Sequence, residues 1–348
     1  MSLLFAEGFD GVDDGLYESN LFDYVFGPSY ITIDTSYGRN GAKGLYSSSG
    51  IGIGYTLTND TVILGYANRR VNSIKTNSND SYNAQWYFLS GGSESGTKQV
   101  TIGYDHLSSK LIARTGDHNG SIIGTSSLDV AMNTWEYIEI KIVHHPTAGS
   151  IIIKMDGVEV MNVTSVNTDP AGTATSDFII KNASSSYAIG SHMDDWYICD
   201  DAGTVNNDFL GDVSIQAVFP TSDGVDQDFT LSTGSDGYAL VDEDPASDSD
   251  YVESGTVTDR FGTAVNATDS GGTILAVVPT NYMINTDVGT MGVKAFAHSS
   301  ASETQSDEMF VGSTGKVHRG VIEFDPNGST AWTYSAINAA EFGIEITS

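Results

Sequence analysis

The sequence is poor in cysteine and in basic residues. Cys199 is the single cysteine among 348 residues, which excludes an internal disulfide and a zinc site built on cysteines. Lysine and arginine together number 15 against 45 acidic residues, so the formal net charge is −30 at pH 7. A surface this anionic repels the phosphates of nucleic acids and anionic membranes. We therefore expect neither as a partner.

Long hydrophobic runs are also missing. No stretch approaches the roughly 18 apolar residues that suggest a membrane-spanning helix. The N-terminus, MSLLFAEGFDG, has no basic region, and its apolar stretch is too short for a secretory signal. The sequence therefore predicts no membrane insertion and no signal peptide.

Turn-forming residues and short apolar runs dominate what is present. The chain has 38 glycines, and 39% of its residues are hydrophobic, which is enough for a globular protein. Turn signals recur at roughly the 8–12-residue spacing of all-β sandwiches and barrels. The length allows two or three domains with their own cores.

The clearest local pattern is a three-stranded meander over residues 135–163. Ile138, Ile140 and Ile142 alternate with charged residues, so one face of this strand is apolar. Two later strand-like runs flank Asp156-Gly157, a dipeptide that favours a type I′ hairpin turn. Other strand-like runs occur without intervening helices, which predicts two stacked antiparallel sheets. They are 29–34, 43–49, 50–57, 61–67, 84–90, 98–105, 110–116, 177–182 and 193–200.

A change in composition near Gly211 indicates a domain boundary. We predict a first domain over 1–213 and a smaller, acidic β-domain over 214–348. Residues 223–250 hold nine acids and no lysine or arginine, which predicts a long solvated loop. Near the end of the chain, WTYSAINAA predicts one short helix, capped by Ser329 or Thr330, before a last strand.

Three runs carry a resemblance to known proteins. WEYIEIKI…GSIIIKMDGVEVMNV resembles the core signature of concanavalin A-like (laminin-G-like) jelly rolls, in which a Trp-led strand precedes a hairpin turning on Asn-Gly or Asp-Gly. GSHMDDWYICDDAGTVNNDFLGDV resembles a segment of virion-associated proteins of tailed bacteriophages, where it closes the jelly roll and leads to a second domain. DPNGSTAWTYSAINAAEFGIEI is similar to the ending of those proteins. The resemblance spans nearly the whole chain.

The resemblance implies a fold and a role. The expected fold is all-β, with a concanavalin A-like jelly-roll sandwich followed by a second, smaller β-sandwich-like domain. The expected role is a non-enzymatic structural component of the virion, in the tail, a tail fibre or the particle surface. It would be made in the host cytoplasm and would bind other virion proteins as a homo-oligomer, a trimer or a hexamer. A capsid decoration (cement) protein and a module that binds a host surface glycan are the alternatives.

The search for catalytic residues gives no convincing set, so we expect no enzyme; a polysaccharide-active enzyme is the least favoured alternative. Many jelly rolls of this type are glycosidases, which pair two carboxylates across the scissile bond. Glu136 and Glu139 are three residues apart and therefore face opposite sides of a strand. Glu341 and Glu345 are expected to lie on either side of a junction between helix and strand.

Calcium is the only cofactor for which we name candidates. Asp200, Asp201 and Asp208 lie in an Asp/Asn-rich stretch that offers hard oxygen ligands, as do 77–80 and 117–120. Asp, Asn and Gly are also the usual residues of turns, so a purely structural role is the alternative.

Aromatic residues provide the candidates for glycan binding. We name Trp86, Tyr87 and Tyr104, with Tyr55, Tyr66 and Tyr82 as further candidates. The alternative is that these side chains form the core, because a sandwich of this size needs buried aromatics.

The strand expected at 193–199 poses a problem of burial. Strict alternation places Asp194 with Trp196, and Asp195 with Tyr197 and Cys199. Whichever face is buried, one aspartate is buried with it and needs hydrogen-bond donors. We therefore expect a structural anchor here and an inert thiol at Cys199. Phe209 and Leu210, just beyond, are expected to pin the second domain to the first.

Overall fold

We describe the protein from a computed structural model of the 348-residue chain. The residues described are 2–12, 22–26, 31–47, 50–55, 57, 59–71, 82–91, 95–105, 108–173, 178–181, 190–244, 246–268 and 271–348. The chain divides into two compact units, Met1–Ile215 and Gln216–Ser348, with a boundary close to the one expected from the sequence.

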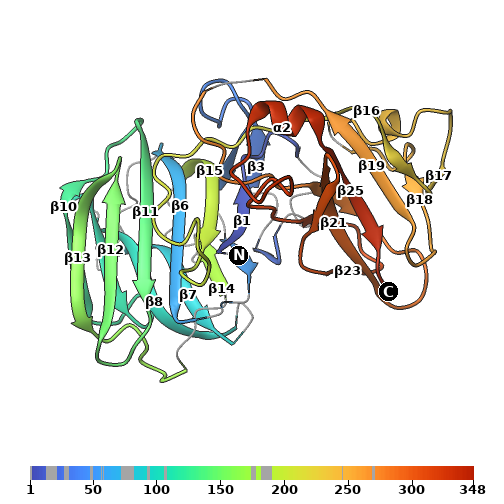
Figure 1. Ribbon diagram of the computed structural model, residues 1–348. Helices are drawn as coiled ribbons and strands as arrows, with labels where there is room; N and C mark the ends of the chain where they lie inside the picture. Colours follow the sequence, from blue (N-terminus) through green and yellow to red (C-terminus); the bar gives the residue numbers. More distant parts are fainter. Residues whose placement is uncertain are drawn as a thin grey trace. The chain divides into compact units, whose positions relative to one another are not determined.

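The first unit is a sandwich of two antiparallel sheets, as Figure 1 shows. One sheet has eight strands in the order β13-β12-β11-β6-β15-β4-β3, with β1 also paired to β15; the other has seven, in the order β10-β9-β8-β7-β14-β5-β2. The predicted all-β jelly roll is confirmed. The strands are β1 (Leu3–Glu7), β2 (Tyr24–Phe26), β3 (Ile31–Asp34), β4 (Gly44–Ser47), β5 (Gly50–Gly54), β6 (Thr61–Arg70), β7 (Tyr82–Ser90), β8 (Thr97–Asp105), β9 (Lys110–Thr115), β10 (Ile122–Asp129), β11 (Trp135–Val143), β12 (Gly149–Met155), β13 (Val158–Val166), β14 (Phe178–Lys181) and β15 (Ser191–Cys199).

The predicted meander is formed by β11, β12 and β13. Ile138, Ile140 and Ile142 of β11 are fully buried between the sheets, as their alternation requires. Asp156 and Gly157 both have positive φ, 49° and 76°, as a type I′ turn demands. The turn joins Met155 directly to its partner Val158.

The core of the first unit is aromatic. The rings of Trp86 and Trp196 lie 5.3 Å apart in an edge-to-face arrangement, and Tyr66 lies 5.1 Å from Trp86. Trp86 Nε1 donates a 2.9 Å hydrogen bond to the Tyr66 hydroxyl. These contacts join strands of both sheets, so they fix how the two layers pack.

The second unit is built on a six-stranded antiparallel sheet in the order β16-β19-β25-β21-β22, with β23 also paired to β21. One face of this sheet packs on an apolar core that includes Phe342, Trp332 and Ile337. The elements are β16 (Pro220–Gln227), β17 (Thr230–Leu231), η2 (Tyr238–Leu240), β18 (Val252–Glu253), β19 (Arg260–Val265), β20 (Thr280–Met283), β21 (Met291–Ser299), β22 (Ser302–Gln305), β23 (Met309–Val311), β24 (Lys316–Arg319), α2 (Tyr334–Ala339) and β25 (Glu341–Ile346).

The acidic segment 223–250 differs from the long solvated loop expected. It begins inside β16, which pairs with β19, and it continues through β17 and the short helix η2. This acidic stretch can form a strand because β16 lies at the edge of the sheet. An edge strand is held by backbone hydrogen bonds on one side and can leave its side chains in water. The side chain of Asp223 accepts a hydrogen bond from Tyr238 N and so holds η2 against β16.

The predicted C-terminal helix is present as α2, but its cap is Thr333 rather than Ser329 or Thr330. The Thr333 side chain accepts a 3.1 Å hydrogen bond from Ala336 N. Among the described residues, no helix is long and apolar enough to cross a membrane.

Candidate functional sites

Trp86, Tyr87 and Tyr104, the three residues named first for glycan binding, are buried. Trp86 is fully buried in the core, and Tyr104 is 1% exposed beneath the guanidinium of Arg70. Tyr87 is 4% exposed, and its hydroxyl lies 3.4 Å from His118 Nδ1. Burial raises the pKa of Tyr87 to about 12. The structure therefore corrects this interpretation, since a buried ring cannot stack on a sugar.

The three calcium candidates serve the local fold. Asp200 is buried, and its side chain accepts a hydrogen bond from Ala202 N. Asp201 accepts a 2.8 Å hydrogen bond from the Thr61 hydroxyl. Asp208 forms an ion pair of 3.1 Å with Lys141 Nζ. These roles match the structural alternative.

The described residues hold no group of three or more His, Cys, Asp and Glu side chains suited to a metal ion. The candidate stretch 77–80 lies outside the described residues. In the other stretch, 117–120, Asp117 accepts a hydrogen bond from Asn119 N, an ordinary turn contact.

A β-bulge in β15 changes the predicted alternation at Asp194 and Asp195. Asp194 pairs with Ala67 and Tyr197 pairs with Gly65, so three steps on β15 match two on β6. Asp195, with φ 49°, is the extra residue. Asp194 and Tyr197 therefore lie on the same face, away from the core, whereas strict alternation separates them.

The residues 208–215, which we call the connector, lie against this outer face. Tyr197 donates a 2.6 Å hydrogen bond to Glu139 Oε1 and accepts one from Leu210 N. The same Glu139 oxygen accepts a 2.8 Å hydrogen bond from Gly211 N. Glu139 is 1% exposed, so one backbone donor, Gly211 N, and the Tyr197 phenol together compensate the burial of its carboxylate.

The end of the connector is held by the bulge. Asp195 Oδ1 accepts a 2.7 Å hydrogen bond from Ile215 N, and Asp195 Oδ2 lies 3.0 Å from Arg39 Nη1. Arg39 also pairs with Asp212 at 2.8 Å, and its backbone N donates to Asp194 Oδ2. The sequence predicts that one of the two aspartates anchors this region; in the structure both of them do so.

Burial is the main cause of the pKa shifts beneath the connector. It raises the pKa of Asp194 to about 8, with a further rise from the neighbouring Asp195, against backbone hydrogen bonds that lower it. It raises the pKa of Asp195 to about 6. Burial also raises the pKa of the Cys199 thiol, whose Sγ lies 3.8 Å from the Asp208 carbonyl oxygen. A thiol in this state is a poor nucleophile, as expected.

Phe209 fixes the start of the connector to the first unit. Its ring lies 4.2 Å from Lys154 Nζ, a cation–π contact with β12. Lys141 of β11 holds the neighbouring Asp208. Phe209 and Leu210 thus contact the first unit; the part of the prediction that concerns the second domain stays a prediction.

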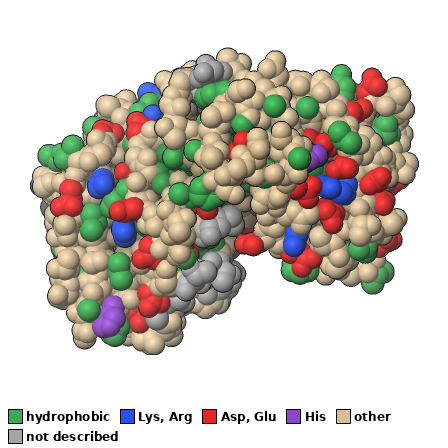
Figure 2. All heavy atoms as spheres, viewed as in Figure 1, with side chains coloured by type: hydrophobic (Ala, Val, Ile, Leu, Met, Phe, Trp, Pro, Cys, Tyr) green, Lys and Arg blue, Asp and Glu red, His purple; other side chains and the backbone are tan. Residues whose placement is uncertain are grey.

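The second unit carries a polar array on the sheet face opposite its core. Glu341 and Glu345 both belong to β25, four residues apart, and therefore share a face. The expectation that they lie on either side of a helix–strand junction is wrong, because α2 ends at Ala339, before both of them. Figure 2 shows acidic side chains around basic ones in this region.

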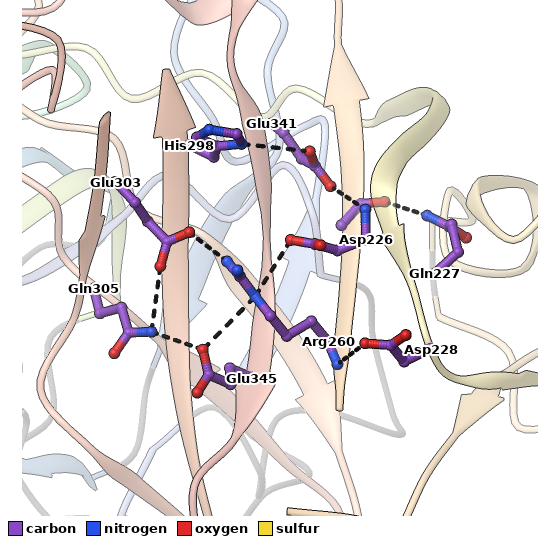
Figure 3. Close-up of polar contacts among 10 residues, drawn as sticks. Asp226, Gln227, Asp228, Arg260, His298, Glu303, Gln305, Glu341 and Glu345 are labelled. Carbon is purple, nitrogen blue, oxygen red and sulfur yellow. Dashed lines mark hydrogen bonds and ion pairs between the residues drawn. The ribbon is translucent and has the colours of Figure 1, made fainter. Parts of the chain in front are cut away.

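Arg260 is the centre of this array (Figure 3). Its Nη2 lies 2.5 Å from Glu303 Oε2, and its Nε lies 3.3 Å from Asp226 Oδ2 and 3.6 Å from Glu345 Oε2. Gln305 Nε2 donates a 2.8 Å hydrogen bond to Glu345 Oε2 and contacts Glu303 at 3.5 Å. We call the six residues Asp226, Arg260, His298, Glu303, Gln305 and Glu345 the charged face.

The Phe296 ring packs against the Arg260 guanidinium. Arg260 Cζ lies 4.1 Å from the centroid of the Phe296 ring, which is fully buried. The ring fits because Gly343 faces it; a Cβ there would overlap the ring. Cation–π contact and the surrounding carboxylates together hold Arg260 in one orientation.

Glu341 lies beside the charged face but is buried. Its Oε1 accepts a 3.0 Å hydrogen bond from Asp226 N, and its Oε2 lies 4.0 Å from His298 Nδ1. The carboxylate occupies space that a side chain at Gly262 or Gly224 would fill. Glu341 thus ties β16 to β25 and positions Asp226.

The charged face offers hydrogen-bond donors and acceptors in one layer. Glu341 and Glu345 are about 13 Å apart at their Cα atoms, from the rise of four strand residues. Sequence reasoning missed Arg260, since nothing local marks it among strand residues.

No family model and no curated protein matches the chain. Among solved structures, alginate lyase Aly36B is similar with a TM-score of 0.39 at 11% identity, over 57% of this chain and 96% of that one. A carbohydrate esterase from the Shiga toxin-encoding bacteriophage phi24B gives 0.34 at 12%, over 49% and 86%. A galectin-like protein of unknown function from Bacillus subtilis gives 0.34 at 9%, over 57% and 98%.

These comparisons correct the expectation that the chain is not an enzyme. The similar structures include alginate lyases and an endo-1,3-beta-glucanase from Streptomyces sioyaensis, so the jelly-roll fold seen here is one that enzymes acting on polysaccharides also have. The missing glycosidase array therefore does not exclude an activity. At this level of similarity, the matches assign no reaction to this chain.

Proposed function

We propose that the chain is a component of a tailed-phage virion, in the tail, a fibre or the particle surface, and that it works through contacts with other virion proteins. The clamped connector is the observation that carries this proposal. Asp195 and Tyr197, which hold it, and Gly211, which is held, all belong to the segment that resembles virion-associated proteins. The hydrogen bonds of this segment thus fix the chain where it leaves the jelly roll.

Exposed apolar side chains at the edge of the sandwich support assembly contacts. The strands β10 and β13 each end a sheet, so each has one side without a strand partner in the described structure. Ile122 and Leu128 of β10, Val158 of β13, and Met132 just after β10 are between 48% and 56% exposed. Free strand edges with large apolar side chains favour pairing with another chain. We propose that copies of this chain meet here as a trimer or a hexamer.

The experiment is to purify intact particles and ask whether the chain is part of them. A component of the virion co-sediments with particles through a density gradient and stays with them at high salt. A chain that remains soluble in the lysate and is missing from washed particles contradicts the proposal. Mass measurement of the isolated protein in solution tests the homo-oligomer.

A further inference from the structure

We propose that the outer face of the eight-stranded sheet binds a sugar that carries a carboxylate, as uronic and sialic acids do. The site is a row of side chains from the neighbouring strands β11, β6, β15 and β4 (Figure 1). Trp135 is paired with Arg69, and His192 is paired with Arg69 on one side and with Tyr46 on the other. Because neighbouring strands lie about 4.8 Å apart, the row is about 14 Å long. We call these four residues, together with Tyr37 beside them, the platform.

The platform faces away from the core of the sandwich. Asn68, Arg70, Leu45 and Met193, which adjoin its residues along the strands, are almost fully buried between the sheets. Alternation therefore directs the side chains of the row to the opposite face, the one that the connector covers farther along β11 and β15. Every platform residue except His192 is partly exposed, so a ligand can reach the row.

Three aromatic rings surround His192. The ring centroids of Tyr37, Tyr46 and Trp135 lie 4.7, 5.8 and 6.4 Å from the His192 centroid, and Tyr37 lies 5.5 Å from Tyr46. These contacts hold the rings in place before a ligand arrives, so binding costs little conformational freedom. Rings that are fixed and partly exposed give the apolar C–H face of a pyranose a surface on which to pack.

The polar groups of the platform are not used within the described part of the chain. Arg69 Nε and His192 Nδ1 are buried and form no hydrogen bond, and His192 as a whole is only 9% exposed. None of the five side chains forms a hydrogen bond or an ion pair with another described residue. Buried polar atoms in folded proteins are almost always hydrogen-bonded. Unpaired groups gathered at one place therefore indicate a bound partner.

Hydrogen-bond donors predominate in the platform, and this decides the class of ligand. The Arg69 guanidinium and the Trp135 indole can only donate, and no platform residue is a carboxylate. His192 is neutral near pH 7, because burial and the neighbouring Arg69 lower its pKa to about 4. A guanidinium binds a carboxylate best, through two parallel hydrogen bonds. The matching ligand combines a carboxylate with an apolar ring face, as an acidic pyranose does.

The acidic residues near the platform do not neutralise Arg69. Asp194 accepts a hydrogen bond from Arg39 N, and Asp195 pairs with the Arg39 guanidinium. Asp34 of β3 accepts a hydrogen bond from Ser36 N. The formal net charge of −30 repels an anionic ligand from a distance, but at physiological ionic strength such repulsion is screened beyond about 8 Å. At contact distance the free guanidinium therefore has the larger effect.

An acidic segment of a partner protein is the competing occupant, because it also brings carboxylates to Arg69. The aromatic rings favour the sugar. A pyranose places an apolar face on the Trp135 ring while its carboxylate reaches the guanidinium, whereas the side chains of Asp and Glu have no such face.

The test is to titrate the full-length chain at physiological salt with a short oligogalacturonate and with sialyllactose. Galacto-oligosaccharide and lactose, which lack the carboxylate, are the matched neutral ligands. We expect one acidic ligand to bind and its neutral counterpart to bind about tenfold more weakly or less, as the loss of a charge-assisted hydrogen bond predicts. Binding of oligogalacturonate assigns a polyuronate to the platform, and binding of sialyllactose assigns a sialylated glycan.

Tryptophan fluorescence locates the bound ligand. The chain has four tryptophans, and Trp86, Trp196 and Trp332 are buried, so Trp135 is the one that a ligand can reach. We expect the acidic ligand to change the fluorescence of the native chain, and Trp135→Phe to remove most of that change.

Arg69→Gln should weaken binding of the acidic ligand about tenfold or more and leave the neutral ligand unaffected. The Arg69 side chain is partly exposed and holds no other described side chain, so we expect the fold to persist, which an unfolding curve checks. Lys98→Gln is the matched control. It removes one positive charge from β8 in the other sheet, where Lys98 packs on the Tyr87 ring, and should leave binding unchanged.

Three results overturn the inference: no binding of either acidic ligand, equal affinity for an acidic ligand and its neutral counterpart, or an affinity that Arg69→Gln does not change. A polyglutamate peptide that binds the platform while neither sugar does assigns it to an acidic protein segment instead. The inference does not rest on a place in the virion, and none of these outcomes bears on whether the chain is found in particles.

Discussion

The Tyr197 hydroxyl donates a 2.6 Å hydrogen bond to a Glu139 carboxylate that is almost completely buried. Leu210 N donates to the Tyr197 hydroxyl, and Gly211 N donates to Glu139. One pair of side chains on β15 and β11 therefore satisfies two backbone donors of the connector. This arrangement holds the chain at its exit from the jelly roll.

Removing the Tyr197 hydroxyl should loosen the connector. Tyr197→Phe leaves Leu210 N without its acceptor and Glu139 without one donor, at a cost of about 1–3 kcal/mol. We expect limited proteolysis to cleave the variant within 208–215 faster than the native chain. Equal cleavage rates at this segment would show that the pair does not hold it.

The close approach of β6 to Tyr197 gives a second test of the same contact. A Cβ at Gly65 would overlap the Tyr197 ring, which the clamp prevents from moving away. Gly65→Ala should lower the free energy of unfolding by about 1–3 kcal/mol in denaturant titrations. Gly11→Ala, where a Cβ meets nothing within 4 Å, is the control and should have little effect.

Stability should depend on pH through Asp194. Its pKa is raised to about 8 from 3.8, so the folded chain keeps this proton to a higher pH than the unfolded chain. The folded state therefore binds more protons in that window, and stability falls as pH rises through it. Arg39, Asp195 and Asp10 are the charged groups that face Asp194.

Three histidines act in the opposite direction at lower pH. Burial lowers the pKa of His192 to about 4 and also lowers the pKa of His144 and of His318, so the stability gained from these groups rises with pH up to about 6.5. Above about pH 6.5 the decline therefore comes mainly from Asp194, because the pKa of the neighbouring Asp195 is about 6. Thermal unfolding should show it between about pH 6.5 and 8 in the native chain and not in Asp194→Asn. An equal slope in both proteins would contradict the assignment.

The thiol of Cys199 should be inert in the folded protein. It is fully buried, and burial raises its pKa. We expect no labelling by a thiol reagent at neutral pH under native conditions and complete labelling in denaturant. Rapid native labelling would show that β15 opens readily.

Replacing apolar residues on the free edges should weaken assembly. Leu128→Asp and Val158→Asp place charges on β10 and β13, where exposed side chains tolerate them in the isolated chain. We expect the oligomer mass to fall towards that of a monomer while the melting temperature is retained. An unchanged oligomer mass would show that the contact between copies lies on another surface.

The sequence predicts the elements that depend only on residues close to one another in the chain. The Asp156-Gly157 turn follows from the left-handed conformation that these two residues accept, and the alternation in β11 follows from its neighbours. Alternation shows which residues share a face but not whether that face is covered. Trp86 was for that reason compatible with both a core position and a glycan site.

Features that depend on pairing between distant strands escape sequence reasoning. The bulge at Asp195 exists only because β15 matches β6, more than a hundred residues away, with one residue extra. Glu341 and Glu345 share a face only because α2 stops before Glu341. Arg260 is the centre of the charged face only because the folded sheet places carboxylates from β16, β22 and β25 around it.

Electron microscopy of intact particles tests the central claim most directly. The account predicts density for the first unit, a jelly-roll sandwich with the connector against its outer sheet face, repeated by the three-fold or six-fold symmetry of a tail, fibre or surface structure. Particles that are complete and infectious with no such density, while the chain is found only free in the lysate, would contradict it.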